Sequence, residues 1–147
     1  MKLAIGADHR GYRFKQRVIE ILEGWGHEVS DMGTHSEESC DYPDFGIKVA
    51  EAAATGLVDF GINICWTGNG MAIASNKVKG ARAGLACSPE MAMLTRSHND
   101  ANVLVLPEKY LPPEELEETL AAFLETEFEG GRHSARLEKI RAKEQAE

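Results

Sequence analysis

The chain has 147 residues, 43% of them hydrophobic, a size and composition typical of one domain with a substantial core. Its 24 acidic and 16 basic residues give a net charge of −8, which argues against a protein that wraps nucleic acid or lies on an anionic membrane. Its three cysteines are far apart and form no C-x-x-C pair, so they fit neither a disulfide framework nor a zinc site. With no signal peptide and no long apolar run, we expect a cytoplasmic protein.

Short apolar runs alternate with amphipathic stretches along the chain. Continuous apolar runs indicate strands, apolar residues at helical spacing indicate helices, and glycine and proline mark the ends. In chain order, the sequence predicts a strand over 2–7, a helix over 12–23, a strand over 27–31, a helix that Pro43 opens over 44–54, a strand over 60–65, a helix over about 70–78, a strand over 81–86, a helix over 89–97, a strand over 103–106, a helix over 113–126 and a last helix over 134–147. Residues 32–42 show no clear period and are predicted as a polar connection.

The alternation predicts a five-stranded parallel sheet with helices on both faces, because parallel neighbours need crossover connections. The expected fold is a Rossmann-like three-layer α/β/α sandwich in a single domain, residues 1–147. Ligands of such sheets bind beyond the carboxyl ends of the strands, where this sequence places Asp8, His9, residues 65–70 and Ser88. His98 comes before the fifth strand, so it must be brought to a site in another way.

The turn at residues 65–70, with the sequence CWTGNG, fits none of three common phosphate or nucleotide motifs. A C-x5-R phosphatase loop would need arginine where Met71 stands, and a Walker loop would need lysine there. The dinucleotide fingerprint would need glycine at the position of Ile73. A nicotinamide cofactor is therefore not expected, and no other cofactor or metal is expected either.

The same turn can form a cradle for an oxyanion. Its glycines place backbone N–H groups at the start of a helix, where free donors and the helix dipole stabilise negative charge. This environment would favour the thiolate of Cys65, which could take a proton from carbon or attack an electrophile. The alternative is a buried structural cysteine, the more frequent role of a lone free cysteine.

Two arginines near the C-terminus suggest an anion site. Arg132 and Arg136 are spaced i, i+4, so they share one face at the beginning of a helix, where the dipole disfavours cations. Arginine also suits bidentate phosphate binding. The alternative is a solvated basic face in a tail that also holds Lys139, Arg141 and Lys143.

Six segments in chain order strongly resemble the type B ribose-5-phosphate isomerases and the related galactose-6-phosphate isomerase subunits. They are Gly6-Ala7-Asp8-His9-Arg10-Gly11-Tyr12, Asp41-Tyr42-Pro43, Cys65-x-Thr67-Gly68-x-Gly70, Ala74-Ser75-Asn76-Lys77, Arg96-Ser97-His98-Asn99-Asp100-Ala101-Asn102 and Glu129-Gly130-Gly131-Arg132-His133. The resemblance runs from residue 1 to about residue 140. One branch of the family has glutamate after the second glycine of the turn; Met71 stands there, so the chain resembles the cysteine branch.

This resemblance implies a metal-independent aldose–ketose isomerase that works through a cis-enediolate, with ribose 5-phosphate and ribulose 5-phosphate as the first expectation. It implies that Cys65 moves a proton between C1 and C2, and that His98 opens the sugar ring with help from Thr67. The other implied contacts are Gly68, Asn69 and Gly70 for the enediolate, and Asp8, Tyr42 and Asn99 for sugar hydroxyls.

For the phosphate, the resemblance implies binding by Arg132 and Arg136 together with His9. A third basic residue is usually arginine, and Lys109 occupies its place here. The resemblance also implies a homodimer or a dimer of dimers, in which the active site is completed across the subunit interface and the C-terminal helix reaches toward the partner.

Trp66 departs from the family, whose members usually carry glycine directly after the cysteine. An indole there could stack on the sugar, close the pocket or pack against the partner, which makes Trp66 a candidate specificity residue. A six-carbon sugar phosphate of the galactose or allose type therefore stays open as substrate. A non-catalytic sugar-phosphate-binding protein and a structural subunit of a heteromer are further alternatives, which the presence of both Cys65 and His98 disfavours.

Overall fold

Five apolar runs form one parallel sheet. In the computed structural model, which describes residues 1–147, the strands are β1 (Lys2–Ala7), β2 (Glu28–Asp31), β3 (Phe60–Cys65), β4 (Ala83–Leu85) and β5 (Val103–Pro107). Their order is β2-β1-β3-β5-β4, and every neighbouring pair is parallel. The carboxyl end of β3 is therefore flanked by the carboxyl ends of β1 and β5.

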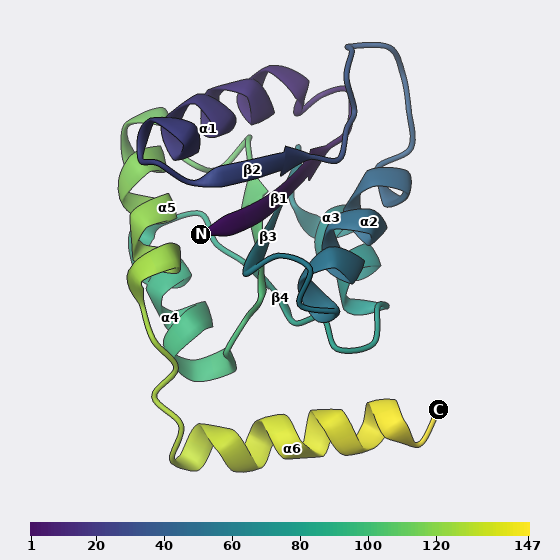
Figure 1. Cartoon of the computed structure of the whole chain (residues 1–147), viewed down its shortest axis with the longest axis vertical. Helices are drawn as coiled ribbons and strands as arrows, with labels where there is room; N and C mark the ends of the chain where they lie inside the picture. The colour runs from purple at the N-terminus through teal and green to yellow at the C-terminus, as the bar shows by residue number, and fades with distance from the viewer.

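Helices cover both faces of this sheet (Figure 1). The helices are α1 (Tyr12–Gly24), α2 (Pro43–Ala54), α3 (Asn69–Asn76), α4 (Pro89–Asn99), α5 (Leu116–Glu125) and α6 (Arg132–Gln145). Helices α1, α4 and α5 share the larger apolar core with one face, whereas α2 and α3 pack on the other. The predicted three-layer α/β/α fold is confirmed.

Successive side chains along each strand point to opposite faces of the sheet, so each strand contributes to both cores. On β1, Leu3 and Ile5 belong to the larger core, while Ala4 packs with α2. Helix α2 faces the sheet with small residues, such as Ala50 and Ala53, so that helix and sheet lie close together.

The predicted elements all form, but several boundaries differ. The fourth strand is only Ala83–Leu85, shorter than predicted, because this edge strand pairs with β5 alone. The helix predicted over 113–126 begins as a 3-10 turn, Pro113–Glu115, before α5. Helix α3 lies over Asn69–Asn76, a little earlier than predicted, because Gly68 caps it.

Two boundary differences concern candidate site residues. Helix α4 continues to Asn99, two residues further than predicted, and ends where Asp100 takes a left-handed conformation with φ of 46°. Helix α6 begins at Arg132 and not at residue 134, directly after Gly130 and Gly131, which both have positive φ. His98 therefore lies in the last turn of α4, and Arg132 in the first turn of α6.

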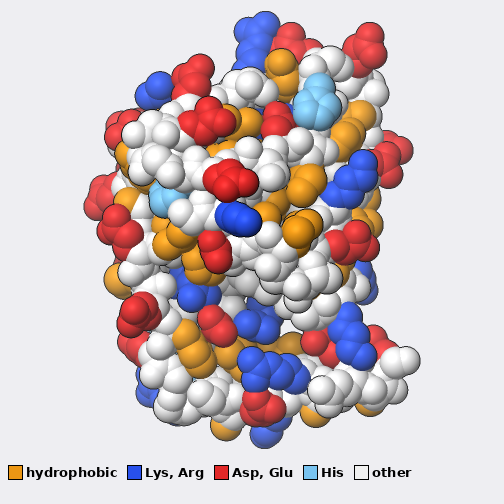
Figure 2. Space-filling view, viewed as in Figure 1, with side chains coloured by type: hydrophobic (Ala, Val, Ile, Leu, Met, Phe, Trp, Pro, Cys, Tyr) orange, Lys and Arg blue, Asp and Glu red, His pale blue; other side chains and the backbone are white.

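Helix α6 lies outside the three layers, beyond the edge at which the strands begin (Figure 1). His133 and Leu137 are its buried residues, and Oε1 of Glu144 accepts the N–H of Gly80 at 3.3 Å. Figure 2 shows a groove between α6 and the rest of the molecule, with basic side chains on both of its walls. The basic residues that line this groove are Lys77, Lys79, Lys139 and Lys143. No helix has both the length and the apolar character needed to span a membrane.

Candidate active site

Cys65 ends the central strand with its side chain 6% exposed and packed against Met71 of α3. Asn63, two residues earlier, points to the same side of the sheet. Its Nδ2 donates to the carbonyl of Gly46 on α2 at 3.0 Å and to Oγ of Ser75 on α3 at 2.9 Å. These buried hydrogen bonds fix both helices against the strand that ends at Cys65.

The turn after Cys65 opens directly into α3. Gly68 is the N-cap of this helix with φ of 83°, a conformation that glycine adopts without strain, and a side chain here would collide with Leu85. Oγ1 of Thr67 accepts the N–H of Asn69 at 3.4 Å. The thiol and the N–H groups of a helix N-terminus therefore share the carboxyl end of β3, an arrangement that can bind developing negative charge beside a base.

Tyr42 lies against this turn and comes from the connection at residues 32–42. A Cβ atom at Gly70 would lie 2.5 Å from Cζ of the Tyr42 ring, so only glycine allows this close contact. The connection is held at its start by Lys15, which is fully buried. Its Nζ donates to Oδ1 of Asp31 at 2.5 Å and to the carbonyl of Thr34 at 2.6 Å.

Trp66 has an ordinary backbone, since Asp100 alone among the non-glycine residues has positive φ. Its side chain is 38% exposed. The guanidinium carbon of Arg10 lies 5.2 Å and Nζ of Lys109 lies 5.8 Å from the centre of its indole ring, within the range of cation–π attraction. Trp66 thus holds two cations at the carboxyl edge of the sheet, and the N–H of Lys109 donates to its carbonyl at 3.0 Å.

Asp8 and His9 follow β1 at the same edge. Asp8 is 8% exposed, and its Oδ1 accepts the N–H groups of Arg10 and Gly11, both at 3.1 Å. These bonds order the turn before α1. Nδ1 of His9 accepts the N–H of Cys40 at 3.2 Å, which leaves Nε2 of the imidazole for another partner.

Glu108 also belongs to this edge, although the sequence reasoning did not identify it. Its N–H donates to the carbonyl of Cys65 at 3.0 Å, and its Oε2 is buried without a hydrogen-bond partner. Burial raises the pKa of Glu108 above its ordinary value, and the negative charge of Asp8 raises this pKa further. Only its place, directly after a strand that neighbours β3, could have pointed to it.

His98 and Asn99 lie at the opposite edge. Helix α4 runs against the strands, so its last turn lies where β5 and β4 begin; there the carbonyl of Asn99 accepts from Nε of Arg82 at 3.1 Å. The imidazole of His98 stacks on that of His133 from α6, with ring centres 4.3 Å apart. Oε2 of Glu129 lies 3.3 Å from Nε2 of His133.

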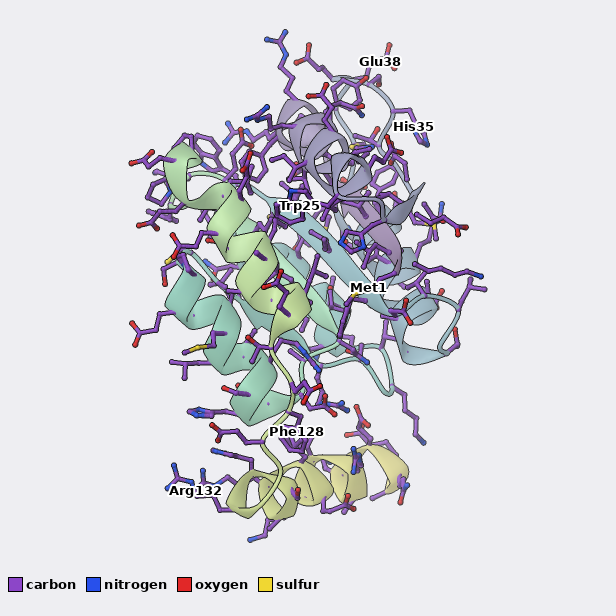
Figure 3. The ribbon with its side chains drawn as sticks, turned by 60° about the vertical axis from the view of Figure 1, so that its left-hand side comes forward. Met1, Trp25, His35, Glu38, Phe128 and Arg132 are labelled. Carbon is purple, nitrogen blue, oxygen red and sulfur yellow. The ribbon has the colours of Figure 1, made fainter.

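Arg132 and Arg136 lie in the first turns of α6, beside this histidine pair. Both are exposed and neither forms an ion pair within the chain, so both are available to an external anion. Figure 3 shows Arg132 at one end of the molecule and His35 and Glu38, in the connection that carries Tyr42, at the other. The structure therefore divides the predicted site residues into two groups at opposite ends of one chain.

We call these groups the thiol group and the histidine group. The thiol group contains Asp8, His9, Tyr42, Cys65, Trp66, Thr67, Gly68, Asn69, Gly70 and Lys109. The histidine group contains His98, Asn99, Arg132 and Arg136. No single chain brings the two groups together.

One cluster has the composition of a metal site. Side-chain ligand atoms of His98, Glu129 and His133 lie within 4.8 Å of one another. The two imidazole planes are inclined by only 17°, however, and imidazole nitrogens bind metals in the plane of the ring. In this stacked arrangement, their lone pairs do not converge on one ion.

The sequence matches the family described as Ribose/Galactose Isomerase over residues 3–140. It is 44% identical over 144 residues to ribose-5-phosphate isomerase B of Escherichia coli, covering 98% of this chain and 97% of the relative. The structure is similar to that of ribose-5-phosphate isomerase B from Clostridium thermocellum, with a TM-score of 0.96, 47% identity and coverage of 99% of both chains. It is also similar to ribose-5-phosphate isomerase B from Mycoplasma genitalium with bound ribulose-5-phosphate, with a TM-score of 0.91, 38% identity and coverage of 98% of this chain and 96% of that one.

Proposed function

Because this chain belongs to the ribose/galactose isomerase family, we propose that it interconverts ribose 5-phosphate and ribulose 5-phosphate. The observation that carries this proposal is the buried thiol of Cys65 directly before the glycine turn that opens α3. Moving a hydrogen between two carbons beside a carbonyl needs one base and one site for the enediolate oxygen, held next to each other. That is the chemistry this turn supports.

In the proposed reaction, the thiolate of Cys65 removes the proton from C2 of the open-chain aldose. The electron pair moves into the C1–C2 bond and the carbonyl electrons move onto O1, where backbone N–H groups of residues 68–70 stabilise the negative charge. Return of the proton from the thiol to C1, together with transfer of the hydroxyl proton of O2 to O1, then gives the ketose. No redox partner is needed, because the carbon that is oxidised and the carbon that is reduced belong to the same molecule.

The histidine group has a role only if a second chain supplies it. We propose a homodimer in which the thiol group of one chain faces His98, Asn99, Arg132 and Arg136 of its partner. His98 would then open the sugar ring as an acid–base group. The two arginines, unpaired in the chain, would bind the phosphate with His9 and Lys109.

The exposed indole of Trp66 supports a five-carbon substrate, because it occupies space at the edge of the site that glycine would leave open. The three cysteines are free, which supports a reducing compartment, and we propose the cytoplasm.

Solvent exchange tests the reaction. The protein should convert ribose 5-phosphate to ribulose 5-phosphate in D2O with deuterium incorporation at carbon, followed by NMR, because a thiol exchanges its proton with solvent. Cys65→Ala should lower kcat by at least about a thousandfold, since it removes the carbon base, and should leave the circular dichroism spectrum and sugar-phosphate binding largely unchanged. Full activity of Cys65→Ala would refute the role of the thiol, and absence of conversion by the wild-type protein would refute the function.

A further inference from the structure

The sheet order places Asp8 and Glu108 on either side of Cys65. Asp8 follows β1 and Glu108 follows β5, and the strand between these two is β3, which ends at Cys65. Burial raises the pKa of Glu108, and the negative charge of Asp8 raises this pKa further. The two carboxyl groups therefore follow the two strands that flank β3, the strand that carries the proposed base.

The two carboxyl groups differ in the hydrogen-bond partners that they have within the chain. Oδ1 of Asp8 already accepts two backbone N–H groups, from Arg10 and Gly11. Oε2 of Glu108 is buried without any partner, and no basic side chain forms an ion pair with Glu108. A buried carboxylate oxygen without a partner is costly unless a donor from outside the chain completes it.

We propose that Glu108 is a further substrate-contacting residue, which with Asp8 receives the hydroxyl groups of the open-chain sugar between the reacting carbons and the phosphate. This inference rests on the proposed function, because it assigns one more contact within the same site. Hydroxyl groups are donors, so they satisfy the free oxygen of Glu108 and separate the two carboxyl groups at the same time. Glu108 thereby contributes to recognising a polyhydroxylated chain.

Two other ligands of this carboxyl pair fit less well. The phosphate carries negative charge, which the pair would repel, while Arg10 and Lys109 offer positive charge beside Trp66 at the same edge. A metal ion would require further ligands, and neither carboxyl group belongs to a cluster of three potential ligands. Sugar hydroxyls remain as the donors that suit the pair.

Two ligands that do not react separate hydroxyl recognition from phosphate binding. Ribitol 5-phosphate carries a hydroxyl group on every carbon that lacks the phosphate, whereas pentyl phosphate has the same chain length and phosphate without hydroxyls. Calorimetric dissociation constants would be measured for both ligands with the wild-type protein, Glu108→Ala, Glu108→Gln and the matched control Glu114→Ala, which removes an exposed carboxylate. Circular dichroism would verify that each variant is folded.

Glu108→Ala should weaken binding of ribitol 5-phosphate about tenfold, the effect expected for one hydrogen bond to a charged group, and should change pentyl phosphate binding less than about twofold. Glu108→Gln, which keeps the size and part of the hydrogen-bonding capacity, should show a smaller loss for ribitol 5-phosphate, and Glu114→Ala none. Equal losses for both ligands would indicate a structural role and overturn the inference, as would unchanged binding of ribitol 5-phosphate by both Glu108 variants. Because neither ligand is turned over, a failure to isomerise ribose 5-phosphate would overturn the proposed function while these affinities still decide the role of Glu108.

Discussion

Trp66, a large residue directly after Cys65, does not strain the turn that follows it. The backbone at this position is ordinary, and the left-handed conformation that the turn requires falls at Gly68. A large side chain is therefore tolerated next to Cys65. Trp66 is partly exposed, and Arg10 and Lys109 both lie within cation–π range of its ring, so its effect falls on the mouth of the site and not on residues 68–70.

Removing the indole should change substrate preference. Trp66→Gly should lower kcat/KM for ribose 5-phosphate about tenfold, because two cation–π contacts of about 0.5–1 kcal/mol each are lost and Arg10 and Lys109 become free to move. The ratio of kcat/KM for six-carbon to five-carbon sugar phosphates should rise, since space opens at the mouth. NMR assays on a panel of both classes would measure it, with Trp66→Phe, which keeps an aromatic face, as the control that retains most of the wild-type preference. An unaltered ratio in Trp66→Gly would show that the indole does not select the sugar.

Some site residues could be predicted from the sequence alone, and others could not. Cys65 could be identified because a thiol before a glycine turn at the end of a strand is a local pattern. Glu108 could not, because a lone glutamate after a strand has no motif, and its meaning depends on β5 lying beside β3, which the chain order does not reveal. The same holds for the stacking of His98 on His133, which brings together two helices that are separate in sequence.

At the scale of elements, the N-terminus of α3 depends on how closely the 32–42 connection can approach it. Gly70 has no side chain, and the Tyr42 ring occupies the space where one would be. The contact thus couples a segment without regular structure to the helix whose N–H groups are proposed to bind the enediolate. A substitution at Gly70 should therefore disturb both the 32–42 connection and the N-terminus of α3.

Gly70→Ala should destabilise the protein by about 1–3 kcal/mol, the usual cost of overpacking, and should lower kcat because Tyr42 and the turn must move apart. Gly24→Ala is the matched control, since nothing lies within 4 Å of a Cβ atom there and alanine favours the helix that Gly24 ends. Chemical unfolding and steady-state kinetics would measure both variants. The double variant Gly70→Ala/Tyr42→Leu should regain stability relative to Gly70→Ala; if Gly70→Ala alone is as stable and active as wild type, the contact does not shape the site.

The elements themselves were predictable because their apolar periods are strong, and the boundaries less so because local capping decides them. The positive φ values of Gly130 and Gly131 start α6 at Arg132, and the left-handed Asp100 lets α4 extend through His98. The start of α6 and the end of α4 each differ from the prediction by less than one helical turn. They nevertheless decide that His98 and Arg132 belong to regular helices and not to loops.

At the scale of the whole molecule, the thiol group and the histidine group lie at opposite edges of the sheet. A helix that returns between parallel strands ends at the edge where the next strand begins, so His98 at the end of α4 is directed away from Cys65. Sequence order alone indicated that His98 needs another route to the site. The structure explains why. Helix α6 lies beyond the far edge of the sheet (Figure 1), and its residue His133 stacks on His98 close to Arg132 and Arg136.

Mixing two inactive variants tests whether sites are shared between chains. Cys65→Ala and His98→Asn should each be nearly inactive alone. When they are refolded together in equal amounts, half of the dimers contain one chain of each kind, and each such dimer has one site with both wild-type groups. The mixture should therefore recover about a quarter of wild-type activity, whereas a site built within one chain would recover none. Size-exclusion chromatography with light scattering would verify that dimers form.

Helix α6 carries Arg132 and Arg136 away from the Cys65 of their own chain. If the proposed pairing holds, an isolated chain folds with every group that the reaction requires and still has no complete site. Specific activity would then depend on protein concentration, falling with dilution through the dimer dissociation constant and returning on reconcentration. If the contact between chains were weakened, the activity per enzyme molecule in the cell would depend on the concentration of the enzyme itself.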